Sequence, residues 1–360
     1  MELVDVAIAG GGPAGACCAA FCARSGLRTV VLERERFPRE KVCGDCLNPS
    51  CTQVLERLGV RERVRALPHA ALSRVDFIAV GGRAISIDLP PGAEIAVKRS
   101  LFDELLMTRA VETGAVTRQG ATVSDLVSPR SKEERWKITA GSEAFAAQVL
   151  VAADGRNSTV ARLLGLLPRI ARERVGLQTH LPLPKGFGPR VVLQFLPEGY
   201  SGQAPVGDNQ LNLCLVGKPS SIAALRVWAE TSFRLPRNHD WRTITPLRRA
   251  ALPPSGDRLF LIGDAARVVE PFTGEGIYYA LRSGELAAEA IISLFASGDA
   301  LAAAHSYTEA HEELYRGRLW VNRLARAAVL SPKISSGLLR IGALPSPILR
   351  LLTSKIVRLP

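Results

Sequence analysis

A glycine-rich turn near the start of the chain has the residue types and spacing to bind phosphate. Gly10, Gly12 and Gly15 form a G-x-G-x-x-G pattern directly after an apolar run rich in Val and Ile. Gly10 permits a tight turn, Gly12 lets the backbone approach a pyrophosphate, and Gly15 lets a following helix pack closely on the strand. The start of that helix, which includes Pro13 and Ala14, presents free N–H groups and a positive dipole end to the phosphates.

An acidic residue farther along completes this pattern. The sequence predicts an Ala-rich helix from Pro13 to about Ser25 and a second strand over residues 27–32, which ends at Glu33. Glu33 lies about 20 residues after the last glycine, where a carboxylate accepts hydrogen bonds from an adenosine ribose. Strand, glycines, helix, strand and acid in this order predict a dinucleotide site.

Cys43 and Cys46 are a second candidate for chemistry, in a loop predicted from its Pro and Gly content. Thiols at C-x-x-C spacing form a redox pair or half of a zinc site. The sequence has no second C-x-x-C and no paired histidines, so no metal site is predicted. A redox pair needs a helix-start setting that lowers a thiol pKa, which this loop could supply. The other interpretation is a turn that packs against a ligand.

Two further polar groups follow predicted strands. Arg99 precedes a helix that Ser100 and Asp103 open as a capping box, with Asp in place of Glu. Arg99 could reach a phosphate or a ribose, or lie exposed on the surface. Asp154 and Gly155 form an acid–glycine turn after a buried strand that begins near Val149.

The middle of the chain has a different pattern. A Gly81–Gly82 turn between alternating runs predicts a hairpin. Prolines and alternating apolar residues over 169–252 predict an antiparallel sheet with one face solvated or lining a cavity. A buried strand over 258–262 then ends at Gly263 and Asp264, followed by a glycine-opened, Ala-rich helix to about Ala296. The Asp264 carboxylate is suited to accept a hydrogen bond from a sugar hydroxyl. The other interpretation is that Asp264 caps the N-terminus of a helix.

Together these motifs resemble the FAD-dependent oxidoreductases of the para-hydroxybenzoate hydroxylase fold, and within them the geranylgeranyl reductases. The resemblance covers roughly residues 3 to 300. It rests on the glycine turn with Glu33, on Asp154-Gly155 continuing to Arg162, and on Gly263-Asp264 with Pro271-x-x-Gly274-x-Gly276-Ile277. Residues 41–45 resemble the K-x-C-G segment of the reductases, and 199–208 resemble their strand over the substrate pocket.

The resemblance implies FAD as cofactor and assigns residues to it. Ala14 and Glu33 are expected at the ADP half, and Asp264 at the ribitol. Gly276 and Ile277 are expected to place N–H groups at the flavin N1–C2=O edge, where reduction puts negative charge. The other implied FAD-binding residues are Gly10, Gly12, Pro13, Gly15, Cys43, Gly44 and Cys46, Arg99 on the phosphate side, Val123 near the adenine, Asp154, Gly155, Pro271 and Gly274.

The fold class is therefore expected to be α/β, with three parts. A discontinuous, Rossmann-like FAD-binding domain with a parallel sheet is expected over 1–72, 98–168 and 253–300. An interleaved antiparallel β domain over 73–97 and 169–252 is expected to bind substrate. Residues 301–360 are expected to form a C-terminal helical, basic amphipathic region.

The resemblance implies a reductase that passes hydride to a C=C bond of a prenyl or other apolar substrate, while a pocket acid such as the Cys43 thiol supplies a proton. Asp45 and residues 200–203 depart from the reductase pattern, which keeps open a monooxygenase acting on an aromatic or polyketide substrate. A non-catalytic, membrane-associated flavoprotein is the third hypothesis. No second glycine-rich fold is present, so NAD(P)H is expected to dock transiently as electron donor. The W-x-W-x-I-P motif of flavin-dependent halogenases is absent, so halogenation is not expected.

Composition agrees with a globular protein that has an unusual tail. Hydrophobic residues make up 47% and charged residues 22%, the net charge is +12, and seven cysteines fit a reduced cytoplasmic setting. No secretory signal and no apolar run of about 18 residues is found.

The basic residues that follow Glu313 are Arg316, Arg318, Arg323, Arg326, Lys333, Arg340, Arg350, Lys355 and Arg358. Residues 316–358 therefore predict contact with an anionic membrane surface or a lipid, or a helix pair docked on the FAD domain. Nucleic acid is not expected, because no aromatic stacking surface accompanies the charge.

Overall fold

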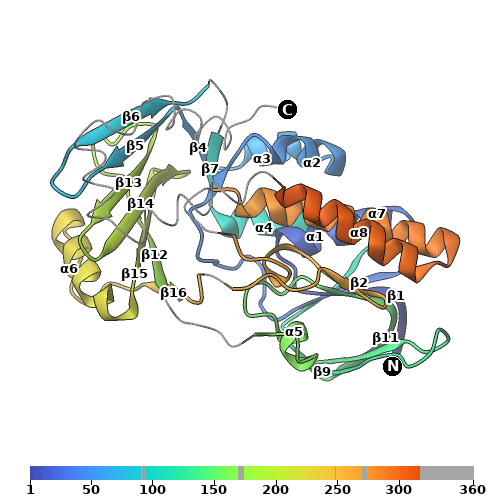
Figure 1. The fold of residues 1–360 in the computed structure, drawn as a ribbon. Helices are drawn as coiled ribbons and strands as arrows, with labels where there is room; N and C mark the ends of the chain where they lie inside the picture. The colour runs from blue at the N-terminus through green and yellow to red at the C-terminus, as the bar shows by residue number, and fades with distance from the viewer. Residues whose placement is uncertain (91, 93, 169–173, 248, 270–273, 317–360) are drawn as a thin grey trace.

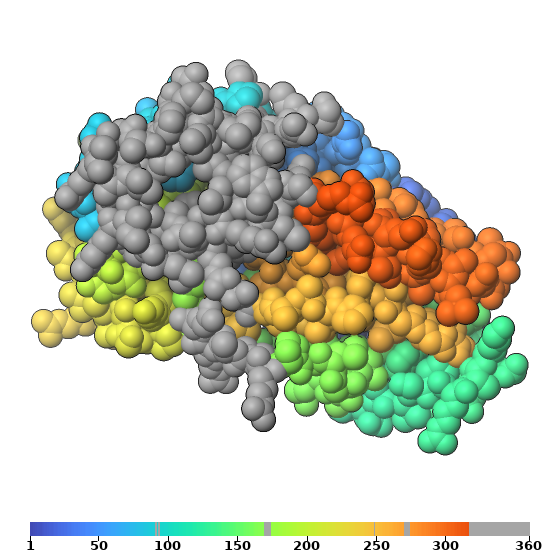
Figure 2. Space-filling view, in the orientation of Figure 1, coloured from blue at the N-terminus to red at the C-terminus, as the bar shows by residue number. Residues whose placement is uncertain are grey.

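The computed structural model describes residues 1–90, 92, 94–168, 174–247, 249–269 and 274–316. Two large sheets lie side by side, with a layer of helices over one of them (Figure 1). The predicted α/β architecture is confirmed. In Figure 2 the outer surface of the helices α7 (Gly276–Ser297) and α8 (Ala300–Tyr315) is coloured orange to red, and that of α6 (Ile222–Phe233) yellow.

The first sheet has eight strands and a parallel centre. Its main order is β17-β18-β11-β1-β2-β8, and β1 (Glu2–Ala9) pairs in parallel with both β11 (Glu143–Ala152) and β2 (Thr29–Glu33). The parallel strands are apolar because both faces of this sheet are covered. The remaining strands of the sheet are β8 (Val116–Gln119), β9 (Val123–Val127), β10 (Trp136–Ala140), β17 (Ser255–Gly256) and β18 (Leu259–Leu261).

Helices cover one face of this sheet. Small side chains along α1 (Pro13–Arg24) are almost all buried, so that α1 lies between the sheet, α4 (Arg99–Glu112) and α7. α2 (Cys51–Leu58) and α3 (Arg61–Ala66) extend the same layer (Figure 1). The opposite face is covered by the β9–β10 hairpin and α5 (Thr159–Leu163). Their apolar residues complete the second core of the sheet.

The second sheet has seven strands in the order β16-β12-β15-β14-β13-β5-β6. The predicted hairpin is formed by β5 (Arg74–Ile78) and β6 (Ala84–Asp88). The antiparallel sheet predicted over 169–252 is confirmed, and the earlier hairpin joins it through a parallel pairing of β5 with β13 (Arg190–Leu196). No tight turn joins these two strands, so chain connection does not impose an antiparallel direction on them. The other strands are β12 (Val175–Pro182), β14 (Gly199–Val206), β15 (Gln210–Gly217) and β16 (Arg242–Ile244).

A small third sheet joins the two large ones. It has the order β3-β7-β4, from β3 (Cys46–Leu47), β7 (Glu94–Val97) and β4 (His69–Leu72). Cys46, expected in a loop, therefore lies on a short strand. The backbone of Pro68 lies so close to Gly207 that a Cβ there would meet the Pro68 carbonyl carbon at 2.3 Å. This contact packs the small sheet against the turn that follows β14.

The C-terminal region is described only to Arg316. α8 confirms the expected helix after residue 300, and Tyr307 anchors it through a hydrogen bond of 2.8 Å to the Leu261 carbonyl. The basic segment 316–358 lies outside the described residues except for Arg316. Among the helices that the structure describes, none combines the length and hydrophobicity needed to cross a membrane.

Candidate functional site

A single cleft runs along the carboxyl ends of the parallel strands and continues onto the second sheet. Four neighbouring parallel strands end at this cleft. Asp264 follows β18, Asp154 follows β11, the glycine turn at Gly10 follows β1, and Glu33 ends β2. Ligands of open α/β sheets bind at this edge. The predicted site residues that line the cleft are Gly10, Gly12, Pro13, Ala14, Glu33, Cys43, Gly44, Cys46, Arg99, Val123, Asp154, Gly155, Asp264, Gly274, Gly276 and Ile277.

Two predicted residues do not appear in this lining. Gly15 lies one residue beyond it, where a Cβ would come within 1.9 Å of the Gly10 carbonyl oxygen. Gly15 is therefore a packing position rather than a wall of the cleft. Pro271 lies outside the described residues.

The geometry of the turn agrees with the three steric roles predicted for its glycines. Gly10 has φ +100°, and a Cβ there would lie 2.6 Å from the Ala153 carbonyl oxygen. At Gly12 the nearest atom to a Cβ is Arg39 Nη2 at 3.6 Å, so this face of the turn is open toward the cleft. The backbone at Gly12 can therefore be approached closely by a ligand, and the N-terminus of α1 points at it.

Glu33 is held rigidly at the end of β2. Its Oε2 accepts the Gly11 N–H at 2.7 Å and its Oε1 accepts the Glu35 N–H at 2.9 Å, and only 6% of the residue is exposed. Each carboxylate oxygen has lone pairs left over for a further donor. The carboxylate is thus held in one orientation at the cleft, with acceptor capacity left for a ligand.

Asp264 and the start of α7 lie at the other end of the cleft. Asp264 sits in a short 3₁₀ turn, Gly263–Ala265, and accepts a hydrogen bond from Arg156 Nη2 at 2.9 Å. It caps no α-helix. The Glu275 side chain does not cap α7, because it accepts the Tyr279 hydroxyl at 3.4 Å instead. Among the residues that the structure describes, no side chain caps the first N–H groups of α7, which lie at Gly276 and Ile277 beside the cleft.

Arg99 is buried rather than exposed, and the predicted capping box does not form. Its guanidinium donates to both carboxylate oxygens of Asp103 at 2.7 Å, and Arg39 pairs with the same carboxylate at 3.0 Å. α4 begins at Arg99 itself, with no side-chain cap from Lys98. Asp103 is held by Arg99, four residues earlier on the same helix, and by Arg39 from a loop distant in the sequence, so it does not turn back to the helix start.

The Cys43–Cys46 loop does not provide the setting expected of a redox pair. Burial raises the pKa of Cys43, and that of Cys46 still more, so the loop does not supply the lowered thiol pKa that a redox pair needs, which favours the other interpretation, a turn that packs against a ligand. Both thiols are free. The Cys43 carbonyl accepts hydrogen bonds from Asn212 Nδ2 at 2.8 Å and from Cys214 Sγ at 3.4 Å, which tie the loop to β15. The loop is thus fixed as a wall of the cleft by its backbone.

Asp45 is a residue whose role the sequence did not show. It is fully buried with φ +61°, and its Oδ2 lies 2.7 Å from His180 Nε2 and 2.8 Å from Asn212 Nδ2. Burial raises the pKa of Asp45, and the hydrogen bond from His180 opposes this shift. The group fastens the loop that carries Cys43 to β12 and β15. Its only signal in the sequence was the departure from the reductase motif.

Lys41 is a second residue that the sequence analysis quoted only within a motif. Its ammonium group lines the cleft, and burial together with the neighbouring Arg99 and Arg156 lowers its pKa to about 8. Lys41 and Arg39, whose Nη2 lies 3.6 Å from where a Cβ on Gly12 would be, thus bring positive charge to the cleft, with Arg39 beside the glycine turn. This charge suits a pyrophosphate.

FAD fits the chain at this place. Asp154 Oδ1 and Arg156 Nε are buried and have no hydrogen-bond partner among the described residues. Buried polar atoms without partners are rare, and a ligand in the cleft would supply them. Together with the open backbone at Gly12 and the two free helix starts, they match a dinucleotide with a negative centre and polar sugars.

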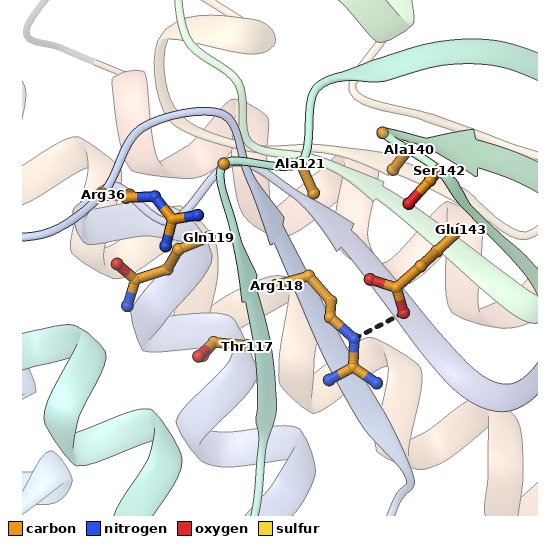
Figure 3. Close-up of a pocket in the computed structure, with 10 residues that line it drawn as sticks. Arg36, Thr117, Arg118, Gln119, Ala121, Ala140, Ser142 and Glu143 are labelled. Carbon is orange, nitrogen blue, oxygen red and sulfur yellow. Dashed lines mark hydrogen bonds and ion pairs between the residues drawn. The ribbon is translucent and has the colours of Figure 1, made fainter.

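A different hollow lies at the edge strand β8 (Figure 3). It is open and polar, and Arg118 Nε donates to Glu143 Oε2 at 2.9 Å across it. Gln119, also in its wall, accepts the Phe37 N–H at 2.8 Å and is thereby engaged in the fold. None of the predicted site residues lines this hollow, so the candidate site is the long cleft.

Comparison with known proteins gives three findings. Residues 3–181 match a family model described as an FAD binding domain. The chain is 32% identical over 321 residues to the menaquinone reductase of Mycolicibacterium smegmatis, which covers 80% of this chain and 76% of that protein. It is 26% identical over 340 residues to digeranylgeranylglycerophospholipid reductase 1 of Methanopyrus kandleri, with 87% of each covered. The flavin-dependent brominase Bmp2 has the same fold, with a TM-score of 0.79 over 98% of this chain and 93% of that one, at 23% identity.

Proposed function

Because the chain belongs to the family of FAD-dependent oxidoreductases, we propose that it is a reductase that hydrogenates a C=C bond of a prenyl or other apolar substrate. The similarity to a menaquinone reductase and to a digeranylgeranylglycerophospholipid reductase supports this direction. Prenylated quinones and prenyl lipids are therefore the first substrates to test.

One observation carries the proposal, namely that the FAD cleft continues into an apolar slot. Its far wall is the inner face of the seven-stranded sheet, with Val75 and Phe77 on β5 and Val191 and Leu193 on β13. Side chains of one strand that share a face alternate in sequence, so these four residues line one surface. Burial of a prenyl group there would contribute about 25 cal/mol per Å² of apolar surface.

The residues of the chain have distinct proposed tasks. Glu33 and Asp264 would orient the cofactor through its sugars, and the N–H groups at Gly276 and Ile277 would stabilise negative charge at the N1–C2=O edge. FAD, when bound, supplies the hydride. The apolar slot would hold the alkene and exclude water. Cys43 is the proton donor to which the resemblance pointed.

The electron donor and the membrane contact are also part of the proposal. NAD(P)H would reduce the flavin by docking transiently, as the resemblance implies. Residues 316–358 would hold the protein at an anionic membrane surface, where a prenyl substrate is dissolved. The net charge of +12 supports such a contact.

A monooxygenase that acts on an aromatic or polyketide substrate is the second candidate. Gln203 on β14 favours it, because this buried amide lines the cleft and interrupts its apolar wall. A polar group at that place suits a substrate with hydrogen-bonding groups better than a bare prenyl chain.

One experiment separates the two candidates. The FAD-loaded protein is reduced without oxygen and mixed with menaquinone or a digeranylgeranyl lipid, and the product is examined by mass spectrometry. We expect a gain of two hydrogen atoms for each reduced bond, with reoxidation of the flavin. A separate mixing with oxygenated buffer follows the flavin spectrum. An oxygenated flavin intermediate, together with an unchanged prenyl chain, would contradict the reductase.

A further inference from the structure

Glu94 lies where the FAD part of the cleft meets the apolar slot. It begins β7 and lines the cleft, and its Oε1 is 3.8 Å from where a Cβ on Gly274 would be. Gly274 belongs to the motif expected at the flavin edge, and the same cleft is lined farther on by the apolar residues of the slot, such as Phe77. Glu94 is thus the carboxyl group at the border between cofactor and substrate.

Glu94 also differs from the other acids of the cleft in its contacts. The carboxyl groups that line the cleft are those of Glu33, Glu35, Glu40, Glu94, Asp154 and Asp264. All of them but one accept a backbone N–H or pair with an arginine. Glu94 has neither kind of partner within the described part of the chain, and burial alone changes its pKa. No described contact that holds the fold together therefore depends on whether Glu94 is protonated or ionised.

The surroundings of Glu94 favour its protonated form. Burial raises its pKa to about 7. The titratable groups of the neighbouring elements that sense it are the thiols of Cys46 on β3 and Cys51 on α2, and the pKa of each is itself raised by burial. No cation among the described residues opposes the effect of burial. A general acid works best when its pKa is close to the working pH.

We infer that Glu94 is the proton donor of the reduction, an inference that rests on the proposed function. One alkene carbon receives a hydride, for which reduced FAD is the source, and the other receives the proton of the Glu94 carboxyl. The π bond breaks, two C–H bonds form, the flavin is oxidised, and the Glu94 carboxylate regains a proton from water. Cys43 is less suited to this step, because burial moves its pKa farther above neutrality.

The test compares Glu94→Gln with the wild type and with Glu143→Gln. Glu143 also begins a strand, but it is exposed and pairs with Arg118 in the other hollow (Figure 3). Each protein is loaded with FAD, reduced with dithionite without oxygen, and mixed with a digeranylgeranyl lipid, which has no quinone ring to accept the electrons in place of a C=C bond. Reoxidation by the substrate should slow about 100-fold or more in Glu94→Gln and stay unchanged in Glu143→Gln. FAD content and melting temperature verify that each variant is folded.

A second readout does not depend on turnover. Infrared difference spectra of the FAD-loaded protein, recorded through a pH titration, should show a protonated carboxyl band that titrates near pH 7. The band should be absent in Glu94→Gln and present in Glu143→Gln.

The outcomes separate the inference from the function on which it rests. A wild type that reduces the prenyl chain, together with an equally fast Glu94→Gln, overturns the donor role alone. A band that persists in Glu94→Gln also overturns it. A wild type that leaves every prenyl substrate unchanged overturns the proposed function and the donor role with it, even if the infrared band is found.

Discussion

The two halves of the cleft are built in different ways. The cofactor half consists of strand ends and helix starts, in which every carboxylate has a partner and the backbone does much of the work. The substrate half is the side-chain face of a sheet, mostly apolar, with Glu94 unpartnered among the described residues at its border. A site for a fixed ligand can hold each carboxylate rigidly by at least one partner, whereas a reacting group must keep a proton free to move. The difference predicts which changes affect the cofactor and which affect only the substrate.

The largest expected effect is at the glycine turn. In Gly15→Val, even the Cβ would lie 1.9 Å from the Gly10 carbonyl oxygen, so the turn must open. We expect FAD binding to be lost and the free energy of unfolding to fall by about 3 kcal/mol or more. Gly12→Ala is the matched control, because its Cβ has space of 3.6 Å and points at the ligand. It should keep its melting temperature without FAD and still bind FAD weakly. Equal FAD affinity in both variants and the wild type would show that the glycine turn does not contribute to FAD binding.

The next effect concerns the carboxylate at the end of β2. Glu33→Ala removes the acceptor of the Gly11 and Glu35 N–H groups and the expected partner of the ribose. We expect the Kd of FAD to rise about 30- to 100-fold, equivalent to about 2–3 kcal/mol. Fluorescence titration of the apoprotein with FAD measures it. An unchanged Kd would show that the ribose is held elsewhere.

A substitution in the apolar slot should affect substrate binding and leave FAD binding unchanged. Leu193→Asn places a polar amide on the slot face of β13 without changing the cofactor half. We expect KM for a prenyl substrate to rise about 10-fold, since burying an unpaired amide costs about 1–3 kcal/mol. The Kd of FAD should not change. A loss of FAD affinity equal to that in Glu33→Ala would contradict the division into halves.

The smallest effect is on stability and depends on pH. Burial raises the pKa of Glu94 from its ordinary value of 4.5 to about 7 in the fold, so ionisation opposes folding. Its stabilising protonated state is complete below about pH 4.5 and is lost as the pH rises through 7. The quantity to compare is the unfolding free energy of Glu94→Gln minus that of the wild type. This difference should be about 1–2 kcal/mol larger at pH 8 than at pH 5.

Denaturant unfolding at the two pH values, with FAD kept in excess, checks this expectation. Glu143→Gln should show no such gain, since Glu143 is exposed and ion-paired with Arg118. If the difference between Glu94→Gln and the wild type is the same at pH 5 and pH 8, Glu94 does not change its protonation state between these pH values.

Much of the cofactor half could be predicted from the sequence, because its residues are close together along the chain. The turn at Gly10, the helix after it and the acid Glu33 are local consequences of steric freedom and apolar periodicity. The carboxyl ends of parallel strands then meet at one edge, which brings Asp154 and Asp264 beside them. The assignment of these residues to FAD stays a prediction, to be tested by the variants above.

Tertiary structure decided what the sequence pattern left open. Ser100 and Asp103 were expected to form a capping box, but the distant Arg39, together with the neighbouring Arg99, holds the Asp103 carboxylate. The sequence left open whether the Cys43 loop lowers a thiol pKa or only packs against a ligand, and burial raises the pKa of Cys43. Glu94 carried no motif at all. In each case the chemistry of a side chain depends on which distant groups surround it and on how much water reaches it, and neither is encoded in the spacing of neighbours along the chain.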